Sequence, residues 1–133
     1  MDTPQLENGY MPIANELFEA FYRCKLVEYE RVIVMHIWRQ TYGWGKKSDW
    51  ISNTQFWYTT GIPKPHVTRT LKSLKDKKIV TSSGNKISVN KNYKEWKVEW
   101  RVLPHQVTTV TSSGNKKLPH QVPTKYNKDN IQN

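Results

Sequence analysis

The segment TGIPKPHVTRTLKSLKDKKIV, residues 60–80, combines a helical apolar pattern with a high density of positive charge. Apolar residues recur in it at the spacing of one helix face, at Val67, Leu71 and Leu74. This stripe is predicted to be buried in a helix that begins at Pro63 or Lys64 and ends near residue 77. The remaining residues are mostly basic or hydrogen-bonding, so the exposed side of the helix is predicted to be cationic.

The segments on either side of this helix complete a motif. A shorter helix is predicted over residues 53–60, with Ser52 as its N-cap and Gly61 as its stop. After the basic helix, the runs KIVTSS and KISVN flank Gly84 and Asn85, whose tolerance of positive φ suits a hairpin turn. Two helices joined by a short Gly-containing turn and followed by a β-hairpin form a winged helix-turn-helix.

The residues before this motif are predicted to add two helices and a short strand. An apolar stripe predicts a helix over residues 12–22. A second helix, residues 28–42 with a left-handed stop at Gly43, is apolar on most of its surface and is predicted to form the centre of the core. His36 is predicted to be a packed core histidine within it. Residues 50–51 are predicted to form a strand. The fold class is therefore mainly α with a small β-hairpin.

Length and composition bound the organisation of the chain. With 133 residues, of which 36% are hydrophobic, it is long enough for one domain with its own core but not for two. The single cysteine, Cys24, favours a buried structural thiol in a reducing compartment. The longest apolar run, VIVMHIW, is too short to span a bilayer, and no secretion signal is recognised. A soluble protein of the cytoplasm, without a membrane partner, is predicted.

Positive charge is concentrated in one part of the sequence. The net charge is +10, yet residues 1–58 carry six Lys and Arg against seven Asp and Glu. Residues 59–94 carry nine Lys and Arg against one acid, Asp76. A field concentrated in this way attracts a polyanion, whereas a merely solubilising surface mixes both signs. Nucleic acid is therefore the predicted partner.

The basic helix and the hairpin supply the predicted DNA contacts. A helix fits the DNA major groove, where side chains near its N-terminus reach base edges in helix-turn-helix proteins. His66 and Arg69 are predicted to read bases, since arginine can form two hydrogen bonds with guanine. Phosphate or backbone contacts are predicted for Lys64, Lys72, Lys75, Lys86 and, at the hairpin tip, Asn85. The predicted interface also includes Pro65, Thr68 and Ser73.

The sequence carries no recognisable catalytic or metal-binding pattern. It has no Gly-rich phosphate loop and no local Ser/His/Asp signature. His105 and His120 recur in a repeat, but a zinc site would need two further ligands that their surroundings lack. The protein is predicted not to be an enzyme and to need no cofactor or metal.

After the hairpin the sequence changes character twice. EWKVEWRV, residues 95–102, alternates apolar and charged residues, which predicts an extended segment packed on its own domain or paired with its copy in a second subunit. LPHQV then occurs twice, and VTSSGNK occurs in both the hairpin and the tail. Because large apolar residues are few, residues 103–133 are predicted to be a disordered, low-complexity tail or linker after a domain of residues 1–102.

Four stretches of the sequence resemble one known family. QLENGYMPIANELFEAF, RQTYGWGKKSDWIS, the basic-helix segment and ISVNKNYKEW are together similar to the N-terminal domain of the bacteriophage replication protein O family, over about residues 6–96. The most specific pieces are QLENGY at residues 5–10, TYGW at 41–44 and NKNY at 90–93. The resemblance implies a winged-helix domain that binds repeated sites of a phage replication origin inside the bacterial host cell, with a homodimer on each repeat.

In long members of that family, a linker leads to a C-terminal part that recruits a helicase loader or helicase. Only a linker-like tail follows here, so recruitment would fall to the tail, to another chain, or to residues beyond a fragment. Sequence-specific binding of double-stranded DNA at an origin is thus the predicted function. The alternatives are a winged-helix transcriptional regulator and a protein-interaction module that exposes a patch of Trp57, Trp96 and Trp100.

Overall fold

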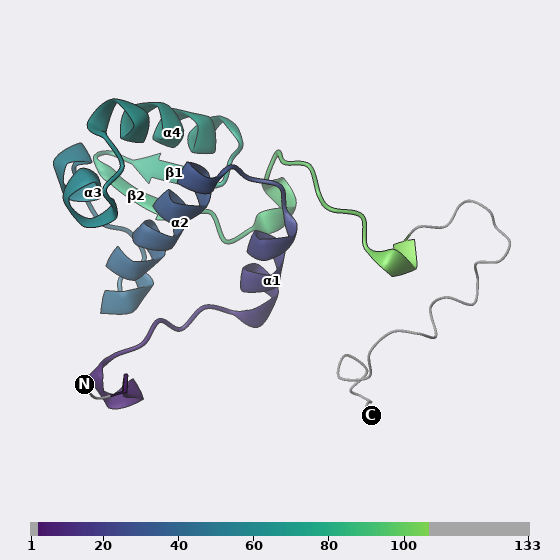
Figure 1. Ribbon diagram of the computed structural model, residues 1–133, viewed down its shortest axis with the longest axis horizontal. Helices are drawn as coiled ribbons and strands as arrows, with labels where there is room; N and C mark the ends of the chain where they lie inside the picture. Colours follow the sequence, from purple (N-terminus) through teal and green to yellow (C-terminus); the bar gives the residue numbers. More distant parts are fainter. Residues whose placement is uncertain (1–2, 107–133) are drawn as a thin grey trace, which may run out of the picture. The chain divides into compact units, whose positions relative to one another are not determined.

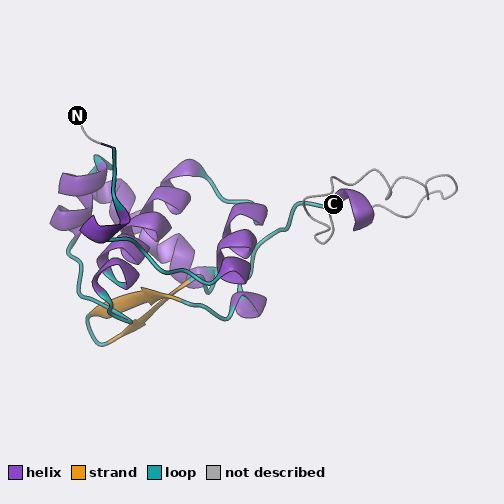
Figure 2. Ribbon diagram, turned by 90° about the horizontal axis from the view of Figure 1, so that it is seen from below, coloured by secondary structure: helices purple, strands orange, loops and turns teal. Residues whose placement is uncertain are grey.

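The computed structural model describes residues 3–106 and shows a mainly helical fold with one β-hairpin (Figure 1). The elements are α1 (Asn15–Arg23), α2 (Glu28–Gln40), α3 (Asn53–Thr60), α4 (Lys64–Asp76), β1 (Val80–Ser83) and β2 (Lys86–Val89). The strands are antiparallel, with Val80 opposite Val89 and Ser83 opposite Lys86, and lie at one edge of the helices (Figure 2). This order confirms the predicted class, a winged-helix-like arrangement.

The core forms around α2, as its apolar composition predicts. Phe21 of α1 packs edge-on against Trp38, with 4.9 Å between ring centroids. From the other side, Phe56 of α3 lies 5.1 Å from the ring of His36. The Nε2 atom of His36 is 3.2 Å from the hydroxyl of Thr59, which satisfies the buried imidazole. His36 is therefore a packed core histidine, as predicted.

Two predicted boundaries near α1 and α2 are wrong. α1 begins at Asn15 and not at residue 12, because Ala14 is extended (ψ 138°) and its carbonyl accepts the first helical hydrogen bonds. α2 ends at Gln40, and the left-handed residue is Gly45 (φ 70°), which closes the 3-10 turn Tyr42–Trp44. Gly43 instead lies so close to the Arg39 side chain that an added Cβ would be 2.8 Å from a guanidinium nitrogen. Because that nitrogen is the end of a flexible side chain that can move aside, neither packing nor backbone conformation requires glycine at this position.

The third and fourth helices match their predicted limits closely. The hydroxyl of Ser52 accepts a 3.0 Å hydrogen bond from the Gln55 amide, which caps α3, and Gly61 ends it at a φ of 80°.

The strand predicted at residues 50–51 is instead an isolated bridge one residue earlier. There, Asp49 exchanges both backbone hydrogen bonds with Ile87 (3.1 and 2.8 Å), which adds a third short edge to the hairpin.

Residues 96–100 run as an extended segment along the same chain, one residue later than predicted because Tyr93–Glu95 form a 3-10 turn. The amide of Lys97 donates to the carbonyl of Lys77 (2.7 Å), and the carbonyl of Glu99 accepts from the Lys25 amide (2.9 Å). Trp96 is buried, and its indole N–H donates to a backbone carbonyl at 2.8 Å. These contacts favour same-chain packing over pairing with a second subunit. The compact unit is Met1–Trp100, and the predicted disordered tail lies mainly outside the described residues.

A buried carboxylate ties the first turn of α2 to the last turn of α4. Glu30 is 3% exposed, and its oxygens accept hydrogen bonds from Lys77 Nζ (2.7 and 3.0 Å), Ser73 Oγ (2.7 Å) and the Val27 amide (3.1 Å). Burial by itself raises the pKa of this carboxyl, but these donors outweigh it, so the pKa lies below its usual value.

Within residues 3–106, no helix has the length and apolarity that crossing a membrane requires.

We predict that Glu30→Gln lowers the free energy of unfolding by about 2–3 kcal/mol at pH 7, somewhat less than for a fully buried pair because Lys77 can reach water. The depressed pKa means that this contribution is present above about pH 4.3, the usual glutamate value, and is lost as the pH falls through the lower native value. Urea denaturation at pH 7 and near pH 3 measures the difference. Glu28→Gln, an exposed acid in the same turn, is the control; an equal effect of both variants would contradict the prediction.

Candidate nucleic-acid interface

One side of α4 is exposed and positively charged, and the opposite side is buried. The buried residues are Val67, Thr70 and Leu74, with Leu71 only half-buried. The core-facing stripe is thus rotated toward Thr70, which is 8% exposed, and away from the predicted Leu71. The exposed residues are Lys64, Pro65, Thr68, Arg69, Lys72, Lys75 and Asp76. We call this set the basic side of α4.

Contacts with α3 and α2 hold the two borders of the basic side. On the α3 border, the Asn53 side-chain amide donates to the Thr68 hydroxyl at 2.7 Å. Lys64 lies on the same border, with its Nζ 5.4 Å from the ring centroid of Trp57. On the α2 border, the His66 ring is 5.5 Å from the ring of Tyr29. The helix is therefore fixed on both sides.

The two residues predicted to read bases contact each other. A guanidinium nitrogen of Arg69 is 2.6 Å from Nδ1 of His66. Because arginine can only donate, Nδ1 accepts and carries no proton in this arrangement. His66 is half-buried while Arg69 is exposed. The geometry therefore suits Arg69 for contact with a base and His66 for holding the guanidinium in place.

Two polar residues of the basic segment, by which we mean residues 59–94, face the protein interior. These are Ser73 and Lys77. The Ser73 hydroxyl donates to Glu30, so Ser73 is half-buried and we do not retain it among the candidate DNA contacts. Lys77 is neutralised by the same carboxylate. Lys72 remains exposed and forms only a 3.6 Å surface ion pair with Asp76. The positive charge available to a partner is thus smaller than the sequence suggests.

The hairpin places the last two predicted contacts at its tip. Asn85 and Lys86 are both exposed there. Gly84 takes a positive φ of 64°, whereas Asn85 does not, so only one of the two turn residues needs left-handed freedom. The chain passes from α4 to β1 through Lys78, also left-handed at 64°, and the Ile79 amide closes the helix on the Leu74 carbonyl at 3.0 Å.

Sequence analysis missed Asn53 and Trp57 as neighbours of the basic side. They are four residues apart, so they share one face of α3, and a hydrogen-bonding residue followed by an aromatic at this spacing was the available signal. The sequence offers Trp57 either for core or boundary packing or for an exposed patch with Trp96 and Trp100. That patch is wrong, because Trp96 is buried and stacks on Trp100 with 6.3 Å between centroids.

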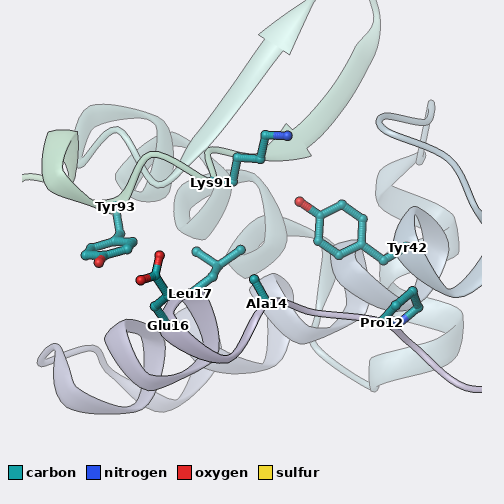
Figure 3. A pocket seen from close by; sticks show the side chains of 7 residues that line it. All are labelled: Pro12, Ala14, Glu16, Leu17, Tyr42, Lys91 and Tyr93. Carbon is teal, nitrogen blue, oxygen red and sulfur yellow. The ribbon is translucent and has the colours of Figure 1, made fainter.

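A separate pocket of about 390 Å³ lies among the N-terminal segment, α1 and the residues after β2 (Figure 3). The residues that line it include Glu16, Tyr42, Lys91 and Tyr93 (Figure 3). Burial raises the pKa of the Tyr42 phenol above its usual value. None of the predicted DNA contacts lines it.

In residues 3–106, no group of three or more His, Cys, Asp or Glu side chains is placed to hold a metal ion.

Comparison with known proteins gives a consistent result. The sequence profile of bacteriophage replication protein O matches residues 3–96. The chain is 37% identical over 133 residues to DNA replication protein gp18 of Salmonella phage P22, covering 96% of this chain and 48% of that protein. It is 39% identical over 77 residues to replication protein 15 of Enterobacteria phage phi80, covering 58% of this chain and 26% of that protein. It is 31% identical over 91 residues to replication protein O of Escherichia phage lambda, covering 68% of this chain and 27% of that protein.

The chain thus spans about half or less of the length of these relatives. No solved structure matches it significantly.

Asp76 places a negative charge on the basic side, so we predict that Asp76→Asn strengthens binding to a DNA duplex. An exposed charge contributes up to about 1 kcal/mol, which corresponds to a two- to fivefold tighter complex at low salt. Fluorescence anisotropy with a random-sequence duplex measures the change. Glu99→Gln is the matched control, since Glu99 is also exposed and also pairs with a lysine, at 3.8 Å, away from α4. Unchanged or weaker binding by Asp76→Asn would place the DNA elsewhere.

Proposed function

The chain belongs to the bacteriophage replication protein O family, and we propose that it binds double-stranded DNA through the basic side of α4 and the hairpin tip. The proposed targets are repeated sites of a phage replication origin, and the proposed role is the initiation of DNA replication. The observation that carries this proposal is the row of exposed cations Lys64, Arg69, Lys72 and Lys75 on a helix of a winged-helix-like fold.

The geometry suits division of the contacts into two kinds. Arg69 is exposed and oriented by His66, so it is the proposed base-reading residue. The lysines of the basic side, with Asn85 and Lys86 at the hairpin tip, are proposed to contact phosphates, which fix register without reading sequence. Thr68 and Pro65 are exposed on the same side of α4 and complete the proposed interface. The names of the relatives, two of which are replication proteins and one a DNA replication protein, support this function.

The partners other than DNA are also proposed from the family. We propose that two copies bind each repeated site as a homodimer in the host cytoplasm. A helicase loader or helicase is proposed as a further partner, reached through residues outside the described part of the chain. We propose no enzymatic activity for the described domain, whose polar clusters serve packing or face solvent.

DNase footprinting on the parent phage genome tests the proposed target. We expect protection of tandem repeats in the origin, with affinity that falls log-linearly as salt rises, because phosphate contacts release counterions. Protection of a promoter without origin repeats would favour the transcriptional regulator. Equal affinity for origin repeats and random duplex would contradict sequence-specific binding.

Two substitutions test the proposed division of labour on α4. Arg69→Ala should relax sequence preference by about 1–3 kcal/mol, because a base contact is lost. Lys72→Ala should weaken all duplexes alike and lower the salt slope by about one, because a phosphate contact is lost. Lys25→Ala, an exposed lysine outside the basic segment, is the control and should change neither quantity. Identical behaviour of the two α4 variants would mean that the helix meets DNA in another orientation.

A further inference from the structure

α3 exposes two neighbouring aromatic side chains beside the basic side of α4. Trp57 is 45% exposed and Tyr58 is 80% exposed. Their ring centroids are 6.5 Å apart, and the rings are inclined by 61°. Aromatic rings carry a large apolar surface, and adjacent exposed rings are typical of a binding surface.

The contacts of α3 determine where these rings point. Thr59 bonds to α2 (3.2 Å) and Asn53 bonds to α4 (2.7 Å), while Phe56 is fully buried between them. With 3.6 residues per turn, Tyr58 lies on the side of α3 opposite Phe56 and points away from the core. Trp57 shares the stripe of Asn53 and borders α4. The pair therefore forms an outward edge next to the proposed duplex-binding surface.

A cation accompanies this edge. Lys64 Nζ lies over one face of the Trp57 indole, 5.4 Å from the ring centroid. The edge also borders residues 59–94, which carry nine Lys and Arg against a single acid. The centre of a protein–protein contact is usually depleted of charge, whereas exposed rings beside cations are the arrangement that binds single-stranded nucleic acid.

We propose that Trp57, Tyr58 and Lys64 form a binding site for single-stranded DNA. Unpaired bases stack on the two rings, and the Lys64 ammonium pairs with an adjacent phosphate. The bases of a duplex are stacked inside the double helix and cannot lie on rings outside it, so the site selects an unpaired strand. This activity goes beyond duplex binding by α4, with which it shares only Lys64.

Fluorescence anisotropy of the full chain with a labelled oligothymidylate of about 16 nucleotides tests the proposal. We expect Tyr58→Leu to weaken this complex about tenfold, because a stacking surface is lost while the bulk of the side chain is partly kept. Its affinity for duplex DNA should stay unchanged, since Tyr58 touches none of the proposed duplex contacts. Trp57→Leu should weaken oligothymidylate binding at least as much.

Tyr22→Leu is the matched control. Tyr22 is also an exposed tyrosine beside another exposed ring, Phe18, at 5.7 Å, but it lies on α1, outside the basic segment. It should leave oligothymidylate affinity unchanged. Thermal denaturation of each variant separates lost binding from lost folding. Tyr58→Phe, which keeps the aromatic ring, should bind oligothymidylate as the wild type does.

The outcomes distinguish this site from the proposed duplex interface. Equal oligothymidylate affinity of wild type, Tyr58→Leu and Trp57→Leu would overturn the proposal and leave the rings to a protein partner. An equal loss in Tyr22→Leu would overturn it as well. If duplex binding fails while Tyr58→Leu selectively loses oligothymidylate, the duplex proposal is wrong and the single-strand site stands.

Discussion

A single buried carboxylate fixes the helix that carries the positive surface. Glu30 accepts four hydrogen bonds, from Lys77, Ser73 and the amide of Val27, and these join the start of α2 to the end of α4. A buried charge without partners would be costly, so α4 is held where its last turn can supply them. The basic side follows from this constraint and from the burial of Val67, Thr70 and Leu74. With that stripe packed inward and Ser73 and Lys77 turned to Glu30 at the α2 border, Arg69 and Lys72 stay exposed to solvent.

The same constraint explains why sequence analysis overestimated the available charge. Spacing alone identified the helix, its limits and its buried side, since Val67 and Leu74 recur at helical intervals and Pro63 precedes the first turn. Spacing does not reveal a partner 47 residues away, which is the separation between Glu30 and Lys77. Thr70 could not be predicted as buried for a related reason. Its burial depends on how α4 rotates against α2, and that rotation is set by contacts between helices.

Local signals served better than distant ones elsewhere in the chain. The Ser52 cap, the Gly61 stop and the hairpin turn at Gly84 each depend on residues only a few positions apart, and each was predicted. The left-handed residue after α2 was placed two positions early, at Gly43, because the 3-10 turn that precedes Gly45 has no distinctive pattern. For the candidate site, Lys64, Arg69 and Lys72 were found from charge, whereas Asn53 and Trp57 became visible only when α3 was packed beside α4.

Lys64 is where the two proposed forms of DNA binding meet. It belongs to the exposed row of α4 and also lies over Trp57, so its ammonium is within reach of a duplex phosphate or of the backbone of a strand stacked on α3. One ammonium cannot neutralise both at full strength, so the two ligands share part of the same electrostatic attraction. If both proposals hold, we expect binding of one ligand to lower the affinity for the other by the same factor in both directions, as linkage requires. On these two proposals the duplex and the unpaired strand compete for Lys64, whereas Arg69 belongs only to the proposed duplex interface and Tyr58 only to the proposed single-strand site.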